Sequence, residues 1–311
     1  MNERRLRVGL AIGSFVASSI SAGCGSDDPM PLRNGVDASA TDAATMHDAS
    51  TDAASVDGSS DAGNRSVAFG IDANDALVRI SLAAPGTVST TAITGLATNE
   101  TILGIDVRPS NGKLYAVGSA SRLYTIDTTS GAATLVGPGA FTPMLSGLAF
   151  GVDFNPVVDR IRIESESGQN FRLHPDTGAV AAADTALSYA IGDANHGIPP
   201  HVTGNAYATP VTVDGGAASV LYALDTALDV LAIQSPPDSG TLTTIGALGI
   251  DLGDRNGFDI RVESGIDQAY VAAAAGGGAS SDLYTINLQT GSLTLIGAVG
   301  GAALRAFALT P

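Results

Sequence analysis

Short runs in which hydrophobic and polar residues alternate recur throughout residues 65–311. One phrase, LYTIDTTSGAATLVG at Leu123–Gly137, returns as LYTINLQTGSLTLIG at Leu283–Gly297. In each copy an alternating run is followed by a turn that contains Gly and then by a second run. Alternation with a period of two predicts β-strands, and two strands joined by such a turn predict a β-hairpin.

A second phrase precedes most of the hairpins. It reads GIDVRP from Gly104, GVDFNP from Gly151 and GFDIR from Gly257, and TGNAY from Thr203 is a degraded copy. One more strand follows each copy, so the repeating unit has four strands. Units begin near residues 102, 148, 202 and 257. Four strands about every 50 residues are typical of a β-propeller blade.

The two ends of this region complete one another. Residues 67–93 supply three strands without a first strand, and residues 304–310 supply a first strand with nothing after it. Joined, they make a fifth blade that closes the ring and leaves no free sheet edge. The sequence therefore predicts an all-β fold, a five-bladed β-propeller closed by its C-terminal strand. A six-bladed propeller and a two-sheet sandwich are the alternatives.

The N-terminal segment has a different character. Basic residues within Met1–Arg7 precede a short apolar run, VGLAIGSFVASSI, and small residues then lead to Cys24, the single cysteine of the chain. The run is too short for a spanning helix and is typical of a secretory signal. The arrangement resembles the lipobox of bacterial lipoproteins, although Ser21 stands where that pattern prefers Leu. The resemblance implies a signal peptide at 1–23 and lipidation of Cys24, with plain secretion as the alternative.

Residues 24–64 are rich in Asp, Ala, Ser and Thr and contain no aromatic residue. A segment of this composition buries too little apolar surface to offset the entropy lost on ordering. We expect a disordered linker there, followed by the folded domain at 65–311.

Net charge excludes one class of partner. The chain carries 31 Asp and Glu against 15 Lys and Arg, a formal charge of −16, whereas nucleic-acid binding requires clustered basic residues. The lipobox resemblance implies a location in the bacterial cell envelope, periplasmic or at the cell surface, with the membrane met only through the lipid anchor. The protein is expected to be a monomer. Its partner would be a protein, a small molecule or a glycan.

Acidic residues recur at one position of the second phrase. Asp106, Asp153 and Asp259 occupy it in three innermost strands, and Asn205 is assigned to it in the fourth. A ring of carboxylates around the central channel could bind a cation such as Ca²⁺. Arg residues lie two positions further on in two of the repeats, on the same strand face, so pairing of Asp with Arg is the other interpretation.

Two loops with the sequence Gly-Asp-x-Asn precede the units that begin near 202 and 257. Alternating oxygen ligands followed by Gly resemble half of a calcium loop, but the distant bidentate Glu is missing. Metal binding and simple capping of the loop by Asp are both open. The candidate ligand-binding residues in and beside these loops are Asp193, Asn195, His196, His201, Asp254 and Asn256, and the Asp and Asn residues among them are also candidate metal ligands.

Several strings resemble an uncharacterised family of bacterial secreted proteins, domain of unknown function 4394. They include GVDFNPVVDRIRIES from Gly151, GDANHG from Gly192 and LYALDTALDVLAIQSPP from Leu221. The resemblance covers nearly all of residues 65–311 and implies a propeller-like repeat domain. It brings no activity, cofactor or catalytic residue.

No complete catalytic set is recognisable in the sequence of the domain. It has no thiol, no Gly-x-Ser-x-Gly motif and no phosphate-binding Gly-Lys motif, so no catalytic residue is assigned. The favoured function is a membrane-tethered module that binds a ligand or protein. The alternatives are a calcium-dependent hydrolase or lyase that uses His196 or His201, and a scaffold whose polar residues are all structural.

Overall fold

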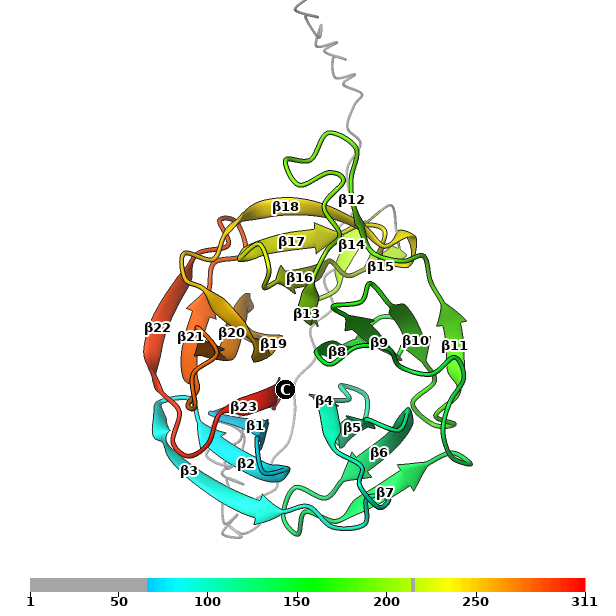
Figure 1. Cartoon of the computed structure of the whole chain (residues 1–311), viewed down its shortest axis with the longest axis vertical. Coiled ribbons are helices and arrows are strands. Elements are labelled where there is room, and N and C mark those ends of the chain that lie inside the picture. Colours follow the sequence, from blue (N-terminus) through cyan, green and yellow to red (C-terminus); the bar gives the residue numbers. More distant parts are fainter. Residues whose placement is uncertain (1–65, 214–215, 311) are drawn as a thin grey trace, which may run out of the picture. The chain divides into compact units, whose positions relative to one another are not determined.

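A computed structural model describes residues 66–213 and 216–310. Within them the chain forms 23 β-strands and one short 3-10 helix, η1 (Pro237–Ser239). Five sheets stand around a central axis as the blades of a propeller (Figure 1). The predicted five-bladed β-propeller is confirmed.

Each blade is an antiparallel sheet whose first strand lies beside the axis. From the axis outward, blade 1 contains β4 (Ile102–Val107), β5 (Leu114–Gly118), β6 (Arg122–Ile126) and β7 (Ala133–Val136). Blade 2 contains β8 (Phe150–Asn155), β9 (Arg160–Ser165), β10 (Asn170–Leu173) and β11 (Val180–Ala183). Blade 4 contains β19 (Leu252–Glu263), β20 (Ile266–Ala275), β21 (Asp282–Ile286) and β22 (Leu293–Ala298).

Blade 3 carries two additions to this plan. Its four strands are β13 (Val202–Tyr207), β16 (Leu221–Asp225), β17 (Val230–Gln234) and β18 (Thr241–Ala247). The short β12 (Ser188–Tyr189) pairs in parallel with β18 at the outer edge. The hairpin of β14 (Val211–Val213) and β15 (Gly216–Ala218) is inserted between β13 and β16.

Blade 5 joins the two ends of the domain. Its innermost strand is β23 (Leu304–Leu309), followed outward by β1 (Val67–Asp72), β2 (Ala76–Ser81) and β3 (Ala84–Ala92). β23 pairs antiparallel with β1, with Ala68 opposite Leu309. The predicted closure of the ring by the C-terminal strand is confirmed.

The turns of the repeated hairpins follow from their sequence. In the turn between β6 and β7, Asp127 Oδ1 accepts the backbone N–H groups of Thr129 and Ser130 at 3.1 and 2.7 Å. Gly131 then adopts a φ of 74°, a conformation that glycine takes without steric cost. Asn287 and Gly291 repeat this arrangement between β21 and β22.

Buried hydrophobic side chains fill four of the five interfaces between blades in the described part of the chain. The exception is the interface between blades 2 and 3, which we call the blade 2–3 interface. On the blade 3 side it has a smaller apolar cluster, which includes Val202, Ala223 and Leu242. Beside this cluster it contains polar side chains that are at most 2% exposed: Arg162, Glu164, Asn170, Asn205 and Gln234. The core is therefore apolar around most of the ring and polar on one side.

Within residues 66–213 and 216–310, no helix has the length and apolar content needed to cross a bilayer. Cys24, the predicted signal peptide at 1–23 and the predicted linker at 24–64 lie outside the described residues. Lipidation and disorder of the linker therefore stay predictions.

Candidate functional site

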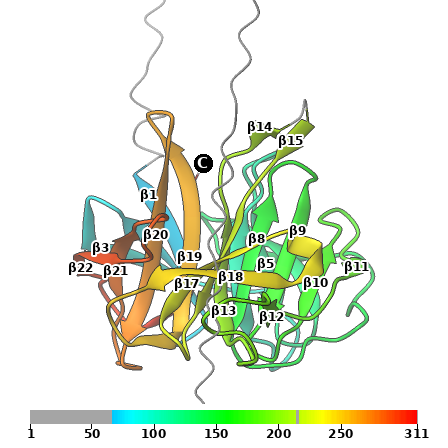
Figure 2. The ribbon, with the colours of Figure 1, turned by 90° about the horizontal axis from the view of Figure 1, so that it is seen from above.

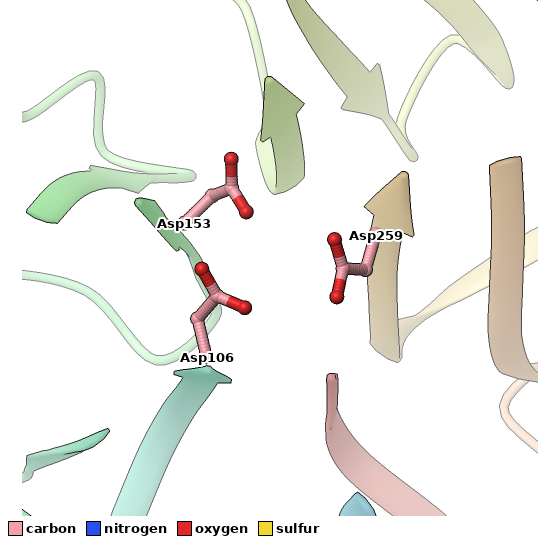
Figure 3. Close-up of side chains that lie close together, drawn as sticks. All are labelled: Asp106, Asp153 and Asp259. Atoms are coloured by element: carbon pink, nitrogen blue, oxygen red, sulfur yellow. The ribbon is translucent and has the colours of Figure 1, made fainter. Parts of the chain in front are cut away.

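Three buried aspartates meet at the axis of the propeller. Asp106 projects from β4, Asp153 from β8 and Asp259 from β19, and their carboxyl groups face one another (Figure 3). One oxygen from each lies within 4.8 Å of the others. Their exposed fractions are 5%, 4% and 7%. We call this group the carboxylate triad.

Hydrogen bonds to the backbone explain why the triad forms. The Oδ2 atom of each aspartate accepts the N–H of a residue in the innermost strand of the next blade. These bonds join Asp106 to Phe154, Asp153 to Tyr207 and Asp259 to Leu309, with oxygen–nitrogen distances of 2.7, 2.6 and 2.6 Å. Each aspartate therefore ties its own blade to the following one.

The two remaining innermost strands donate to the triad as well. Asp106 Oδ1 accepts the N–H of Val107 and Asp259 Oδ1 accepts that of Ile260, both at 2.6 Å. Three carboxylates thus accept one N–H from each of the five innermost strands. Buried N–H groups require such partners, so the triad also stabilises the centre of the ring.

The assignment of Asn205 to the fourth aspartate position is wrong. Tyr207 donates to Asp153 in the way that Phe154 donates to Asp106, so the residue before it, Ala206, occupies that position. Gly204 matches the glycines of the other repeats, and two residues after it comes Ala206, not Asn205. The Asn205 side chain instead donates to Glu164 Oε2 at 3.1 Å in the blade 2–3 interface.

Pairing of the triad with Arg is also wrong. Arg108 donates to Asp159 and Asp176, with shortest distances of 2.5 Å to each. Arg261 donates to Glu263 at 2.8 and 2.5 Å. Both guanidinium groups therefore bind other carboxylates. In the described part of the chain, no Lys, Arg or His forms an ion pair with the triad.

Burial without a basic partner perturbs the triad strongly. Burial raises the pKa of Asp106 to about 6, although a hydrogen bond with Asp153 opposes the rise. Burial, together with repulsion from Asp106 and Asp259, raises the pKa of Asp153 well above its usual range. Burial and repulsion from Asp106 do the same for Asp259. Full ionisation of the triad is therefore unfavourable unless a positive charge binds beside it.

The triad lies at the bottom of a pocket of about 400 Å³ at the C-terminal ends of the innermost strands. Most of the residues beside the triad are apolar. They are Val107, Phe154, Ala208, Ile260 and Leu309, with Pro109, Pro156 and Pro210 further out. The side chains of Val107, Phe154, Ile260 and Leu309 pack in the apolar interfaces between blades. The polar lining residues besides the triad are Tyr207, Thr209, Arg261 and Ser264. The pocket thus combines an acidic floor with walls that are mostly apolar and that include one guanidinium group, that of Arg261, which is paired with Glu263.

Two hairpins extend the wall of this pocket on one side. The β14–β15 hairpin and the end of the β19–β20 hairpin project beyond the blades on the same side of the ring (Figure 2). Asp267 joins them, since its Oδ1 accepts the N–H of Thr209 at 3.2 Å and also the Thr209 hydroxyl. We call these two segments the hairpin wall. Sequence reasoning missed it, although the extra residues between TGNAY and LYALD were a usable signal.

The first Gly-Asp-x-Asn loop is fastened to the outer edge of blade 3. Asp193 accepts the N–H and hydroxyl of Thr244 in β18 at 2.7 and 2.9 Å. Asn195 donates to the same hydroxyl at 2.9 Å, and His196 Nδ1 lies 3.1 Å from the carbonyl oxygen of Tyr189. These contacts hold the loop in place and keep the three candidate residues away from the axis.

The second Gly-Asp-x-Asn sequence lies within strand β19 and not in a loop. Asp254 Oδ1 is 3.0 Å from His201 Nε2 and accepts the Thr226 hydroxyl at 2.8 Å. Asn256 is buried and donates to Thr203 at 2.7 Å. His201 and Asp254 thus come together, but at the N-terminal ends of the innermost strands, opposite the triad.

The candidate metal ligands consequently fall into separate groups. Within residues 66–213 and 216–310, the triad is the one set of three or more His, Cys, Asp or Glu side chains close enough to share a metal ion. Asp193 with Asn195 lies at the outer edge of blade 3, and Asp254 with Asn256 lies at the opposite end of the axis.

The family model described as domain of unknown function (DUF4394) matches residues 76–308. The chain belongs to the DUF4394 family. Its fold agrees with the propeller-like domain that the resemblance implied. A comparison with curated proteins found no match for this DUF4394 chain.

Solved structures with similarity to the DUF4394 propeller include the following three. Glutaminyl cyclase from Myxococcus xanthus is 16% identical with a TM-score of 0.43, over 73% of this chain and 84% of that one. BBS1N in complex with ARL6DN is 12% identical with a TM-score of 0.38, over 74% and 66%. Hydrazine synthase from Kuenenia stuttgartiensis is 11% identical with a TM-score of 0.35, over 66% and 52%. The chain thus spans about two thirds and one half of the latter two.

Proposed function

We propose that this DUF4394 propeller is a binding module, tethered to the bacterial cell envelope through Cys24, whose ligand site is the central pocket. The observation that carries the proposal is the carboxylate triad, which is buried at the floor of a pocket of about 400 Å³ and forms no ion pair with a described basic residue. Arg261 also lines this pocket, but its guanidinium group is paired with Glu263. A volume of this size suits a small molecule.

The ligand contributes a positive charge. Three adjacent buried carboxylates repel one another, and a cation beside them offsets both the repulsion and the loss of hydration. A metal ion such as Ca²⁺ or the ammonium group of an organic molecule supplies the same chemistry. Tests with both kinds of cation distinguish the two sources.

A histidine-dependent hydrolase receives less support from this geometry. The residues that line the pocket include no histidine. His201 lies at the other end of the innermost strands, and His196 lies at the outer edge of blade 3. Neither histidine reaches a ligand bound at the triad.

Thermal unfolding of the purified protein with CaCl2, with EGTA and with alkylammonium salts tests the proposal. A ligand that binds only the folded state at a hundred times its Kd adds about 2.7 kcal/mol to the free energy of unfolding. We expect a rise in Tm with at least one of these cations, and loss of that rise in Asp153→Asn.

The matched control is Asp238→Asn, which removes the charge of an exposed aspartate on η1. This variant should respond to cations as the unmodified protein does. Equal responses of the unmodified protein and Asp153→Asn to every cation would refute binding at the triad.

A further inference from the structure

The residues that line the walls of the pocket indicate which class of cation it binds. A site for a bare metal ion needs oxygen ligands on all sides, but beyond the triad most of the residues that line the pocket are aliphatic, aromatic or proline. Arg261, the one basic residue of the lining, is held by Glu263. The lining residues next to the triad or bonded to it are Val107, Phe154, Ile260 and Leu309. Their side chains pack between blades and offer no oxygen to a metal ion.

We propose that the pocket binds an organic ammonium ion, a primary amine carried on an apolar body. The ammonium group lies on the carboxylate triad, and the apolar body lies against the pocket walls and the hairpin wall. This inference rests on the proposed function and names the class of its ligand.

The number and spacing of the triad oxygens match an ammonium group. A primary ammonium has three N–H donors, and the triad presents three carboxylates. Charge-assisted N–H···O contacts of about 2.8 Å at tetrahedral angles place three oxygens about 4.6 Å apart. The three oxygens lie within 4.8 Å of one another, a spread that accommodates this arrangement.

The coordination needs of calcium are met less well. Ca²⁺ takes about six to eight oxygen ligands. Five of the six triad oxygens already accept a backbone N–H, and Asp153 Oδ1 is the one without such a bond. An oxygen that accepts one hydrogen bond keeps a lone pair that can bind either an N–H or a metal ion, so the number of ligands decides: three oxygens satisfy an ammonium group, and calcium needs about six to eight. Calcium would have to draw most of its shell from water in an apolar pocket.

The hairpin wall extends the apolar surface above the floor. Val262 lines the pocket and is 41% exposed. Val211 and Ile266, on the same two segments, are 51% and 63% exposed. Exposed hydrophobic side chains gathered beside a pocket mark a surface for an apolar partner. Because the hairpin wall rises on the side of blades 3 and 4, it would contact one side of the ligand's body.

Isothermal calorimetry with a homologous series tests the ligand class. The probes are methylammonium, propylammonium and hexylammonium chloride, with 1-hexanol as the neutral analogue and CaCl2 as the metal. We expect affinity to rise with each added methylene until the chain fills the pocket, by up to about fourfold per methylene. Binding of 1-hexanol should be undetectable, because the triad would remain without a cation.

Variants separate the two parts of the site. Asp153→Asn keeps one side-chain oxygen for the Tyr207 N–H, so it should fold, and it should weaken every ammonium probe roughly tenfold to a hundredfold. Val262→Ser should weaken hexylammonium several-fold and leave methylammonium unchanged. The matched control is Leu295→Ser, which alters an exposed residue of the outer strand β22 and should change neither.

The outcomes distinguish this inference from the proposed function. Calcium binding that is lost in Asp153→Asn, without ammonium binding, would overturn the organic ligand and leave a cation site at the triad. Ammonium binding that does not depend on chain length or on Val262 would overturn the apolar recognition. Absence of binding for every cation would overturn both proposals.

Discussion

Asp153 differs from the other members of the triad in how its oxygens are used. Its Oδ2 accepts the Tyr207 N–H, whereas no backbone group bonds its Oδ1. Its hydrogen bond with Asp106 lowers the pKa of Asp106 and raises the pKa of Asp153. Ionisation of Asp153 is therefore disfavoured in the unliganded protein. Replacement by Asn mimics the neutral form and keeps an oxygen for Tyr207.

We predict that Asp153→Asn stabilises the unliganded protein at pH 8 and not at pH 4. The pKa values of the triad in the folded protein lie above those of aspartates in the unfolded chain. The triad therefore makes its full contribution to the free energy of unfolding below the unfolded pKa of about 3.9. That contribution falls as the pH rises through the folded-state values, which begin at about 6 for Asp106. Removal of one charge should raise the free energy of unfolding at pH 8 on the order of 1–3 kcal/mol.

Denaturant titrations at pH 4 and pH 8 measure this difference. Asp153→Ala serves as the comparison, because it removes the same charge together with the bond to Tyr207. It should therefore gain less than Asp153→Asn. An Asp153→Asn protein that is less stable than the unmodified chain at pH 8 would contradict the electrostatic account.

Among the secondary-structure elements, the strands and hairpins were predictable because their signal is local. Alternation of apolar and polar residues marks each strand. Asp or Asn followed four residues later by Gly, as at Asp127 and Gly131, marks a turn. The shared fifth blade followed from counting strands. Sequence patterns alone thus identified the propeller.

The contacts of the candidate site were less predictable, because they join residues far apart in sequence. The three aspartates were found from their repeated position, but their bonds to the backbone of the next blade have no sequence signature. Asn205 was misassigned because a degraded repeat leaves the register uncertain by one residue, which exchanges the two faces of a strand. Arg108 was expected to pair with an aspartate of the triad, yet its long side chain reaches Asp159 and Asp176.

We predict that a chain ending at Ala303, without β23, forms no stable monomeric propeller. The deletion removes Leu304, Phe307 and Leu309, which are at most 3% exposed, and it leaves β1 as a free edge. Loss of their burial costs roughly 5–9 kcal/mol, which is comparable to the whole stability of a typical domain. The unpaired edge should also promote association.

Circular dichroism and light scattering report the outcome of this truncation. Addition of a peptide with the sequence of residues 303–311 should restore part of the folded signal, because the peptide supplies the missing strand. A truncated chain that remains monomeric with an unchanged Tm would show that blade 5 does not hold the ring closed.

At the scale of the whole molecule, the interfaces between blades differ in polarity around the ring. Four interfaces between blades are apolar, and the blade 2–3 interface includes polar contacts such as that of Arg162, which donates to the Tyr207 hydroxyl at 3.1 Å. Burial raises the pKa of Glu164 in the same interface. Polar contacts need exact partners to offset desolvation, so this interface is the one most sensitive to substitution.

We predict that the full chain fractionates with bacterial membranes through Cys24. Cys24→Ala should abolish labelling by radioactive palmitate and release the protein into the soluble fraction, because at least two acyl chains are needed for stable anchoring. The cation responses of the released protein should be unchanged. Palmitate labelling that survives in Cys24→Ala would refute the lipobox interpretation.

The closure of blade 5 also determines when the central pocket is completed during folding. Thr310 bonds Val67 across a separation of 243 residues, so the blade begun first during synthesis is completed last. Contacts of such long range form slowly. Leu309 both donates to Asp259 and lines the pocket, which means that the binding site is assembled only when the final strand arrives. Until β23 pairs with β1, the pocket therefore lacks Leu309, and Asp259 lacks its bond to the next blade.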